Sequence, residues 1–101
     1  MKVLVDVSIV PLGVGLSLSS YIAECERIFL DAGLKTALHA YGTNIEGEWD
    51  AVFGAIRRCH ERLHEMGAPR ITASLRVGTR TDCDQTLEQK VQSVQQKLSE
   101  K

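Results

Sequence analysis

The stretch LKTALHAYGTNIEG, residues 34–47, decides the predicted fold. The half before Tyr41 predicts a short strand, and the half after it predicts another strand directly behind. Two glycines bracket a hydroxyl, an amide and a carboxylate in that second half. In a strand, Thr43 lies on one face while Asn44 and Glu46 lie on the other. The pattern fits a hairpin that contacts a ligand, and it equally fits a plain turn with a short edge strand.

A strand and a helix are expected on the N-terminal side of this stretch. Apolar residues alternate over residues 3–9 and predict a strand with one β-branched face, which turn residues at 11–15 then end. A serine-rich segment follows, in which Ser19 or Ser20 is expected to be the N-cap of a helix. Gly33 is the expected C-terminal stop of that helix.

A helix, a strand and a second helix are expected on the C-terminal side. From Glu48 the apolar period becomes that of a helix, which Gly67 ends, and Pro69 then opens a long strand. Asp82 and Asp84 are the expected caps of the last helix. The helix that begins near Glu48 has an apolar stripe of Trp49, Val52, Phe53, Ile56, His60 and Leu63. The last helix repeats apolar residues at coiled-coil-like spacing, at Leu87, Val91, Val94 and Leu98.

The order of these elements predicts an α+β protein, a ferredoxin-like βαββαβ sandwich with an additional C-terminal helix. We expect one domain over residues 1–101, with the helix of residues 82–101 in oligomer contacts. The sheet face away from the helices mixes Asp6, Ser74 and Arg76 with apolar residues, so contact with another subunit is expected there. A solvated face with a loosely attached tail helix is the alternative.

Composition excludes several classes of protein. A net charge of −1 with scattered Lys and Arg gives no basic footprint for nucleic acid. No run of 18 apolar residues occurs, so no membrane span is expected, and the N-terminal apolar run is too short for a signal peptide. Cys25, Cys59 and Cys83 are odd in number and form no C-x-x-C pair, which is typical of reduced thiols. A cytoplasmic protein is expected.

The segment HERLH, residues 60–64, spells H-E-x-x-H on a predicted helix. His60 and His64 would bind zinc, and Glu61 would act as a general base. Against this, His60 belongs to the apolar stripe and no third ligand has a recognisable spacing. A zinc hydrolase stays open as an alternative.

Several segments together resemble a known family. They are Pro11-Leu12-Gly13, Ser17 and Ser19 before the first helix, GTNIEG at 42–47, and RVGTRTD at 76–82. The chain is similar over essentially its whole length to a family of small thiamine-binding proteins with bacterial, archaeal and yeast cytosolic members. The run over residues 49–82 looks closest to the yeast branch. Tyr41 departs from the family pattern, in which a less bulky residue is expected before Gly42.

The resemblance implies a ferredoxin-like fold and a tetramer built as a dimer of dimers through sheet contacts. It also implies non-catalytic binding of thiamine, or of its hydroxymethylpyrimidine half, near a subunit interface, with no further cofactor and no metal. Carried over by position, the ligand-binding residues are Thr43, Asn44, Glu46, Ser17, Ser19 and Arg80. A carboxylate such as Glu46 can accept a hydrogen bond from the exocyclic amine of the pyrimidine.

Three hypotheses therefore follow from the sequence. The first is a homo-oligomer that binds thiamine or a related pyrimidine. The second is the zinc hydrolase built on residues 60–64. The third is a regulatory or scaffolding oligomer without a small-molecule ligand.

Overall fold

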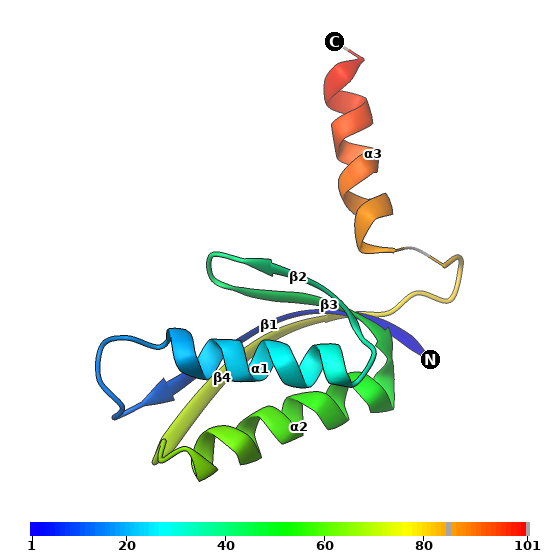
Figure 1. Ribbon diagram of the computed structural model, residues 1–101. Coiled ribbons are helices and arrows are strands. Elements are labelled where there is room, and N and C mark those ends of the chain that lie inside the picture. The colour runs from blue at the N-terminus through cyan, green and yellow to red at the C-terminus, as the bar shows by residue number, and fades with distance from the viewer. Residues whose placement is uncertain (85, 101) are drawn as a thin grey trace.

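The computed structural model describes residues 1–84 and 86–100. Its elements are β1 (Lys2–Leu12), α1 (Ser19–Asp31), β2 (Lys35–His39), β3 (Gly42–Glu48), α2 (Trp49–Glu65), β4 (Arg70–Gly78) and α3 (Leu87–Ser99). The strands form one antiparallel sheet in the order β2-β3-β1-β4. Helices α1 and α2 cover one face of the sheet, and α3 stands away from both (Figure 1). The predicted ferredoxin-like fold with an additional C-terminal helix is confirmed.

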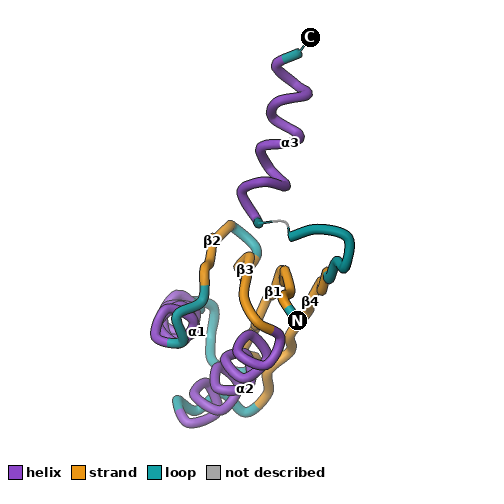
Figure 2. The backbone as a smooth tube through the Cα atoms, turned by 90° about the vertical axis from the view of Figure 1, so that its right-hand side faces the viewer, coloured by secondary structure: helices purple, strands orange, loops and turns teal. Residues whose placement is uncertain are grey.

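The buried residues form one core between the sheet and helices α1 and α2, whose backbone arrangement Figure 2 shows. Strand β1 alternates as predicted, because Val3, Val5, Val7 and Ile9 are all buried on the helix side. Each such side chain contributes roughly 1.5–3 kcal/mol by leaving water. The two helices add the buried residues Cys25, Phe29, Val52, Ala55, Ile56, Cys59 and Leu63.

The buried stripe of α2 differs from the prediction in its centre. Ala55 and Cys59 are fully buried, whereas Trp49 is 37% exposed and His60 is half-buried. The rings of Trp49 and Phe53 contact each other at the start of the helix, with centroids 4.6 Å apart. The fully buried side chains of α2 thus include the small Ala55 and Cys59 beside Val52 and Leu63, while the aromatic pair lies at the start of the helix.

Both glycine stops are confirmed, while the predicted N-caps are not. Gly33 and Gly67 have φ of 73° and 102°, a conformation that glycine adopts without a side-chain clash. Helix α1 begins after Leu18 without a side-chain cap, and the serines lie inside its first turn, so the predicted serine cap is wrong. Helix α3 is capped by Thr86 and by neither of the predicted aspartates. The Thr86 hydroxyl accepts a hydrogen bond from the Gln89 backbone N–H, and the Gln89 side chain accepts one from the Thr86 backbone N–H.

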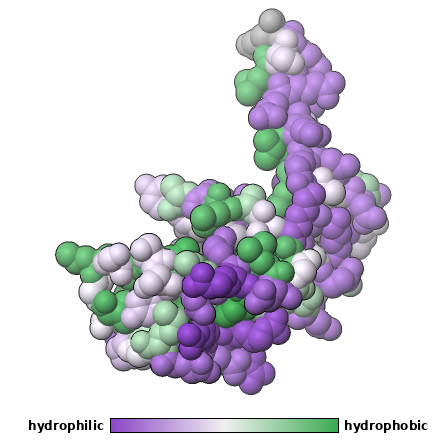
Figure 3. Space-filling model, viewed as in Figure 1, coloured by the Kyte–Doolittle hydropathy of each residue, from purple (hydrophilic) through white to green (hydrophobic). Residues whose placement is uncertain are grey.

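Helix α3 leaves its apolar stripe uncovered. Val91, Val94 and Leu98 are 55%, 59% and 69% exposed. Figure 3 shows hydrophobic side chains at intervals along this helix among hydrophilic ones. The helix starts later than the predicted residue 82, and residues 85 and 101 of that predicted segment lie outside the described residues. None of the described helices is long and apolar enough to cross a lipid bilayer.

Replacing glycine by alanine should have opposite effects on stability at Gly42, where β3 lies close to β1, and at Gly54 inside α2. At Gly42 an added Cβ would lie 2.5 Å from the Val7 carbonyl oxygen, so the backbone would have to move. We expect Gly42→Ala to lower the free energy of unfolding by about 1–3 kcal/mol in urea titrations. Gly54→Ala is the matched control, because its Cβ would meet only Arg58 Nη1 at 3.8 Å inside α2. It should raise stability by about 0.5–1 kcal/mol. Equal effects of both changes would contradict this account.

Candidate functional site

The predicted ligand-binding residues separate onto the two faces of the sheet. Thr43 is 4% exposed and faces α1, together with the buried Ile45. Asn44 and Glu46 alternate with them and therefore face the open side. The Thr43 hydroxyl and the Glu46 carboxylate therefore lie on opposite faces of the sheet, as the strand alternation predicted.

A hollow of about 340 Å³ lies on the helix side, between α1, β1 and the β2–β3 hairpin. Thr43 lines it, and its Oγ1 donates a hydrogen bond to Glu26 Oε2 over 3.0 Å. Burial raises the pKa of the Glu26 carboxyl above its usual value, and the hydrogen bond from Thr43 opposes that shift. A partly desolvated acid next to a hydroxyl can accept a hydrogen bond when ionised and donate one when protonated.

The walls of this helix-side hollow are mostly apolar. They include Val7, Ile9, Leu18, Ile22, Phe29 and Leu38. Among the described residues that line it, Glu26 is the sole acid, and lysine and arginine are absent. Such a hollow suits a flat, apolar body with a polar or cationic edge.

The rim of the helix-side hollow is built from the hairpin and the start of α1. Leu38 and Tyr41 line it, although they are 62% and 88% exposed. Tyr41, the departure from the family pattern, therefore stands at the mouth of the hollow. Ser17 and Ser19 are exposed and flank Leu18, which contributes to the wall.

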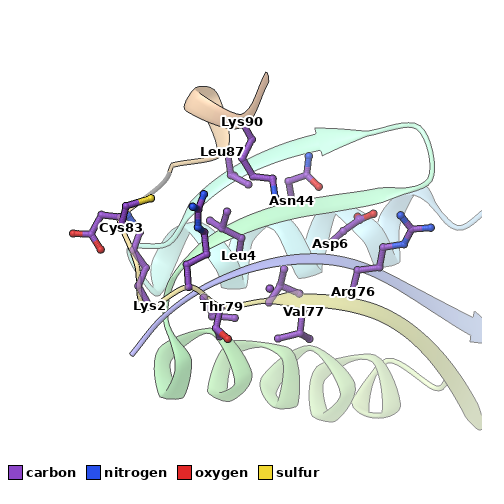
Figure 4. A pocket seen from close by; sticks show the side chains of 15 residues that line it. Lys2, Leu4, Asp6, Asn44, Arg76, Val77, Thr79, Cys83, Leu87 and Lys90 are labelled. Carbon is purple, nitrogen blue, oxygen red and sulfur yellow. The ribbon is translucent and has the colours of Figure 1, made fainter. Parts of the chain in front are cut away.

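A second hollow, of about 440 Å³, lies on the open face between the sheet and the start of α3 (Figure 4). Asn44 and Arg80 are part of its lining, so this hollow gathers two of the predicted ligand-binding residues. Its basic residues are Lys2, Arg76, Arg80 and Lys90, and its acids are Asp6 and Asp84.

Arg80 follows β4 and binds a neighbouring carboxylate. Its Nε donates to Asp82 Oδ1 over 2.9 Å, and its second guanidinium nitrogen donates to the other oxygen. These bonds lower the pKa of the Asp82 carboxyl to about 2. Asp82, predicted as a helix cap, thus pairs with the arginine at the end of β4.

Glu46 connects the sheet to α3. Its Oε1 accepts a hydrogen bond from the Leu87 backbone N–H over 2.8 Å, and its Oε2 lies 3.6 Å from Lys2 Nζ. A carboxylate at a helix N-terminus satisfies a free N–H group and opposes the positive end of the helix dipole. The Glu46 side chain is only 10% exposed, so in this chain its contacts are to α3 and β1.

The H-E-x-x-H segment does not build a metal centre with other described residues. Within residues 1–84 and 86–100 no group of three or more His, Cys, Asp or Glu side chains could hold a metal ion. His64 Nδ1 lies 2.8 Å from the Ala68 carbonyl oxygen just beyond the end of α2. His60 is half-buried on the same helix, and Glu61 is exposed. The segment lies at the C-terminal end of α2, and the described part of the chain supplies no third metal ligand beside it.

Glu26 is the residue that the sequence reasoning missed. Counted from Ile22, Glu26 is at position i+4 and Phe29 is at position i+7, so Glu26 is an acid on the apolar side of α1. That position was a signal in the sequence, because an acid on a buried face needs a partner. Its partner is Thr43, 17 residues away.

Fold and site together define a ferredoxin-like protein with a small-molecule-sized hollow on each face of its sheet. A family model described as "Thiamine-binding protein" matches residues 5–95. The chain belongs to this family, as the sequence resemblance indicated.

Named relatives and solved structures agree with that membership. The UPF0045 protein sll0230 of Synechocystis is 58% identical over 95 residues, covering 94% of this chain and 78% of that protein. The UPF0045 protein ECM15 of Eremothecium gossypii is 44% identical over 101 residues, covering 99% and 96%. Identity is higher to the cyanobacterial protein, so these two comparisons do not single out the yeast branch.

The solved structures show the same fold. The crystal structure of MJ1052 from Methanocaldococcus jannaschii has a TM-score of 0.87 at 33% identity, covering 93% of this chain and 96% of that one. A Thermotoga maritima structure has a TM-score of 0.79 at 22% identity, covering 93% and 99%, and it shows the fold alone.

The half-buried Glu26 predicts a pH-dependent cost to stability. Because the folded chain raises the pKa of Glu26, the folded state holds this proton more tightly than the unfolded state. Wild-type stability should therefore fall as the pH rises from the ordinary pKa of a glutamate carboxyl towards the raised pKa of Glu26 in the folded state, and it should stay lower above that pH. Glu26→Gln lacks this titration, so we expect it to be more stable than wild type near neutral pH and to lose that advantage in acid.

Urea unfolding at about pH 3.5 and about pH 7 would measure this difference. Glu61→Gln is the matched control, since Glu61 is exposed on α2 and should change stability by less than about 0.5 kcal/mol at either pH. If Glu26→Gln changed stability equally at both pH values, the claim that burial raises the pKa of Glu26 would be refuted.

Proposed function

We propose that the chain binds thiamine, or its hydroxymethylpyrimidine half, in the helix-side hollow without transforming it. The observation that carries the proposal is the hydrogen bond of 3.0 Å between Thr43 and Glu26 at an apolar hollow. Membership of a family described as thiamine-binding supports the ligand class.

The chemistry of the hollow matches the ligand. Thiamine combines a cationic thiazolium ring with an aminopyrimidine that offers donor and acceptor groups on one edge. Ionised Glu26 would accept from the exocyclic amine, and protonated Glu26 would donate to a ring nitrogen. A cationic ligand also offsets the cost of keeping this carboxylate partly desolvated.

Electrostatics favours this hollow over the open-face hollow. The open-face hollow is lined by four Lys and Arg residues and two Asp residues, and this excess of positive charge would repel the thiazolium cation. We therefore propose Thr43 and Glu26 as the primary contacts, with Ser17 and Ser19 at the rim. Asn44, Glu46 and Arg80 lie across the sheet and make no direct contact in this proposal.

A second copy of the chain would complete the site. Leu38 and Tyr41 are exposed at the rim, and β2 is an edge strand, so a partner packed there would cover both the hollow and these side chains. The uncovered stripe of α3 provides a separate surface. Two such surfaces support a homotetramer built as a dimer of dimers.

A reducing compartment fits the thiols. Cys25 and Cys59 are free and buried, and Cys83 is free and exposed. A cytoplasmic, non-catalytic binding protein is thus the function that we propose. A scaffolding oligomer with an empty hollow is the alternative that the binding measurement decides.

Calorimetric titration of thiamine into variants on each face of the sheet tests which face binds the ligand. We expect wild-type protein to bind thiamine with a dissociation constant on the order of 1 μM, about −8 kcal/mol. Glu26→Gln should weaken binding about tenfold or more, because it removes a charge-assisted hydrogen bond. Glu46→Gln is the matched control and should leave the affinity unchanged, since the glutamine oxygen can still accept from Leu87.

Two results would contradict the proposal. One is the absence of binding heat at millimolar thiamine. The other is a loss of affinity in Glu46→Gln with no loss in Glu26→Gln. Light scattering on the same samples tests the interface, and a monomer mass would remove that part of the proposal.

A further inference from the structure

We propose that the open-face hollow is a separate site for a phosphate monoester carried on a small apolar body. This goes beyond thiamine binding, because the site lies on the other face of the sheet and uses other residues. Its features are four lining cations, apolar walls, and two of those cations, Arg76 and Lys90, that form no ion pair with another described residue.

The positive charge comes from three separate parts of the chain. Lys2 opens β1, Arg76 lies on β4, Arg80 follows it, and Lys90 lies in the first turns of α3. Figure 4 shows Lys90 reaching from α3 towards the sheet, where Leu4 and Asn44 lie. A protein with a net charge of −1 thus gathers four of its twelve Lys and Arg residues around one hollow.

Protein acids compensate only part of this charge. Lys2 lies 3.6 Å from Glu46, and Arg80 binds Asp82. Asp6, the register neighbour of Arg76, has its Oδ1 2.8 Å from His39 Nε2.

Within residues 1–84 and 86–100, Arg76 and Lys90 have no ion-pair partner. Both residues line the open-face hollow, so a dianion bound there would supply a counter-charge, and the planar Arg76 guanidinium suits bidentate binding of a phosphate.

The shape of the hollow indicates more than a bare ion. Gly78 is paired with Leu4, and a Cβ built there would meet only the Leu4 carbonyl oxygen at 3.9 Å, so the floor is open at this point. Leu4 and Leu87 provide apolar walls, and the Asn44 amide provides a further donor. A volume of about 440 Å³ holds a phosphate together with a ring-sized body.

Binding of two probes tests the proposal. Inorganic phosphate and phenyl phosphate would be titrated into the whole chain in a phosphate-free buffer of low ionic strength, with phenol as the probe that lacks the anion. We expect both phosphates to bind, phenyl phosphate to bind more tightly, and phenol not to bind. Arg76→Gln and Lys90→Gln should each weaken phenyl phosphate about tenfold, the loss of one charge-assisted hydrogen bond.

Two further variants act as controls. Arg58→Gln makes the same change on α2, away from the hollow, and should leave affinity unchanged. Gly78→Leu should block phenyl phosphate without changing charge, while thiamine binding stays as in wild type. Absence of phosphate binding, or equal losses in Arg58→Gln and Arg76→Gln, would overturn the site. So would a loss of the oligomer in Arg76→Gln and Lys90→Gln, because these cations would then pair with acids of a second copy.

Discussion

The two-residue period of β3 is the constraint on which the rest of the structure depends. It sends Thr43 and Ile45 into the layer between sheet and helices, and it sends Asn44 and Glu46 to the open face. A polar cluster that is continuous in sequence thus becomes two chemically different environments. One is an apolar hollow with a single acid, and the other is a recess lined mainly by cations.

Each environment joins the sheet to a different helix. On the inside, Thr43 holds Glu26 of α1 in a place where its charge is disfavoured. On the outside, Glu46 holds the first N–H of α3, and Lys35 pairs with Glu88 over 2.8 Å beside it. These contacts set where α3 leaves the sheet, while its apolar stripe stays available to another chain. The hairpin therefore positions both a candidate ligand site and a candidate assembly surface.

The fold could be predicted from the sequence because its signals are local. Alternation in β1 and the stops at Gly33 and Gly67 each depend on residues close together in the chain. Glu26 and Glu46 could not be assigned in the same way, since their partners lie 17 and 41 residues away. The family resemblance predicted that Thr43 and Glu46 both bind the ligand, although the strand alternation already placed their side chains on opposite faces of the sheet.

The error at the N-cap of α3 has a different cause, because the signal that decides this cap is local. A Ser or Asp before an apolar run is a frequent cap, but the reciprocal bonds of Thr86 and Gln89 satisfy two N–H groups at once. A Thr-x-x-Gln signal was present at residues 86–89 and outweighs the two aspartates upstream.

A crystal structure of the protein grown with thiamine tests the central claim most directly. The account predicts the pyrimidine ring on the helix side of the sheet, with a ring substituent within hydrogen-bond distance of a Glu26 carboxyl oxygen and Tyr41 at its edge. Thiamine bound instead on the open face, beside Asn44 and Arg80, would contradict it.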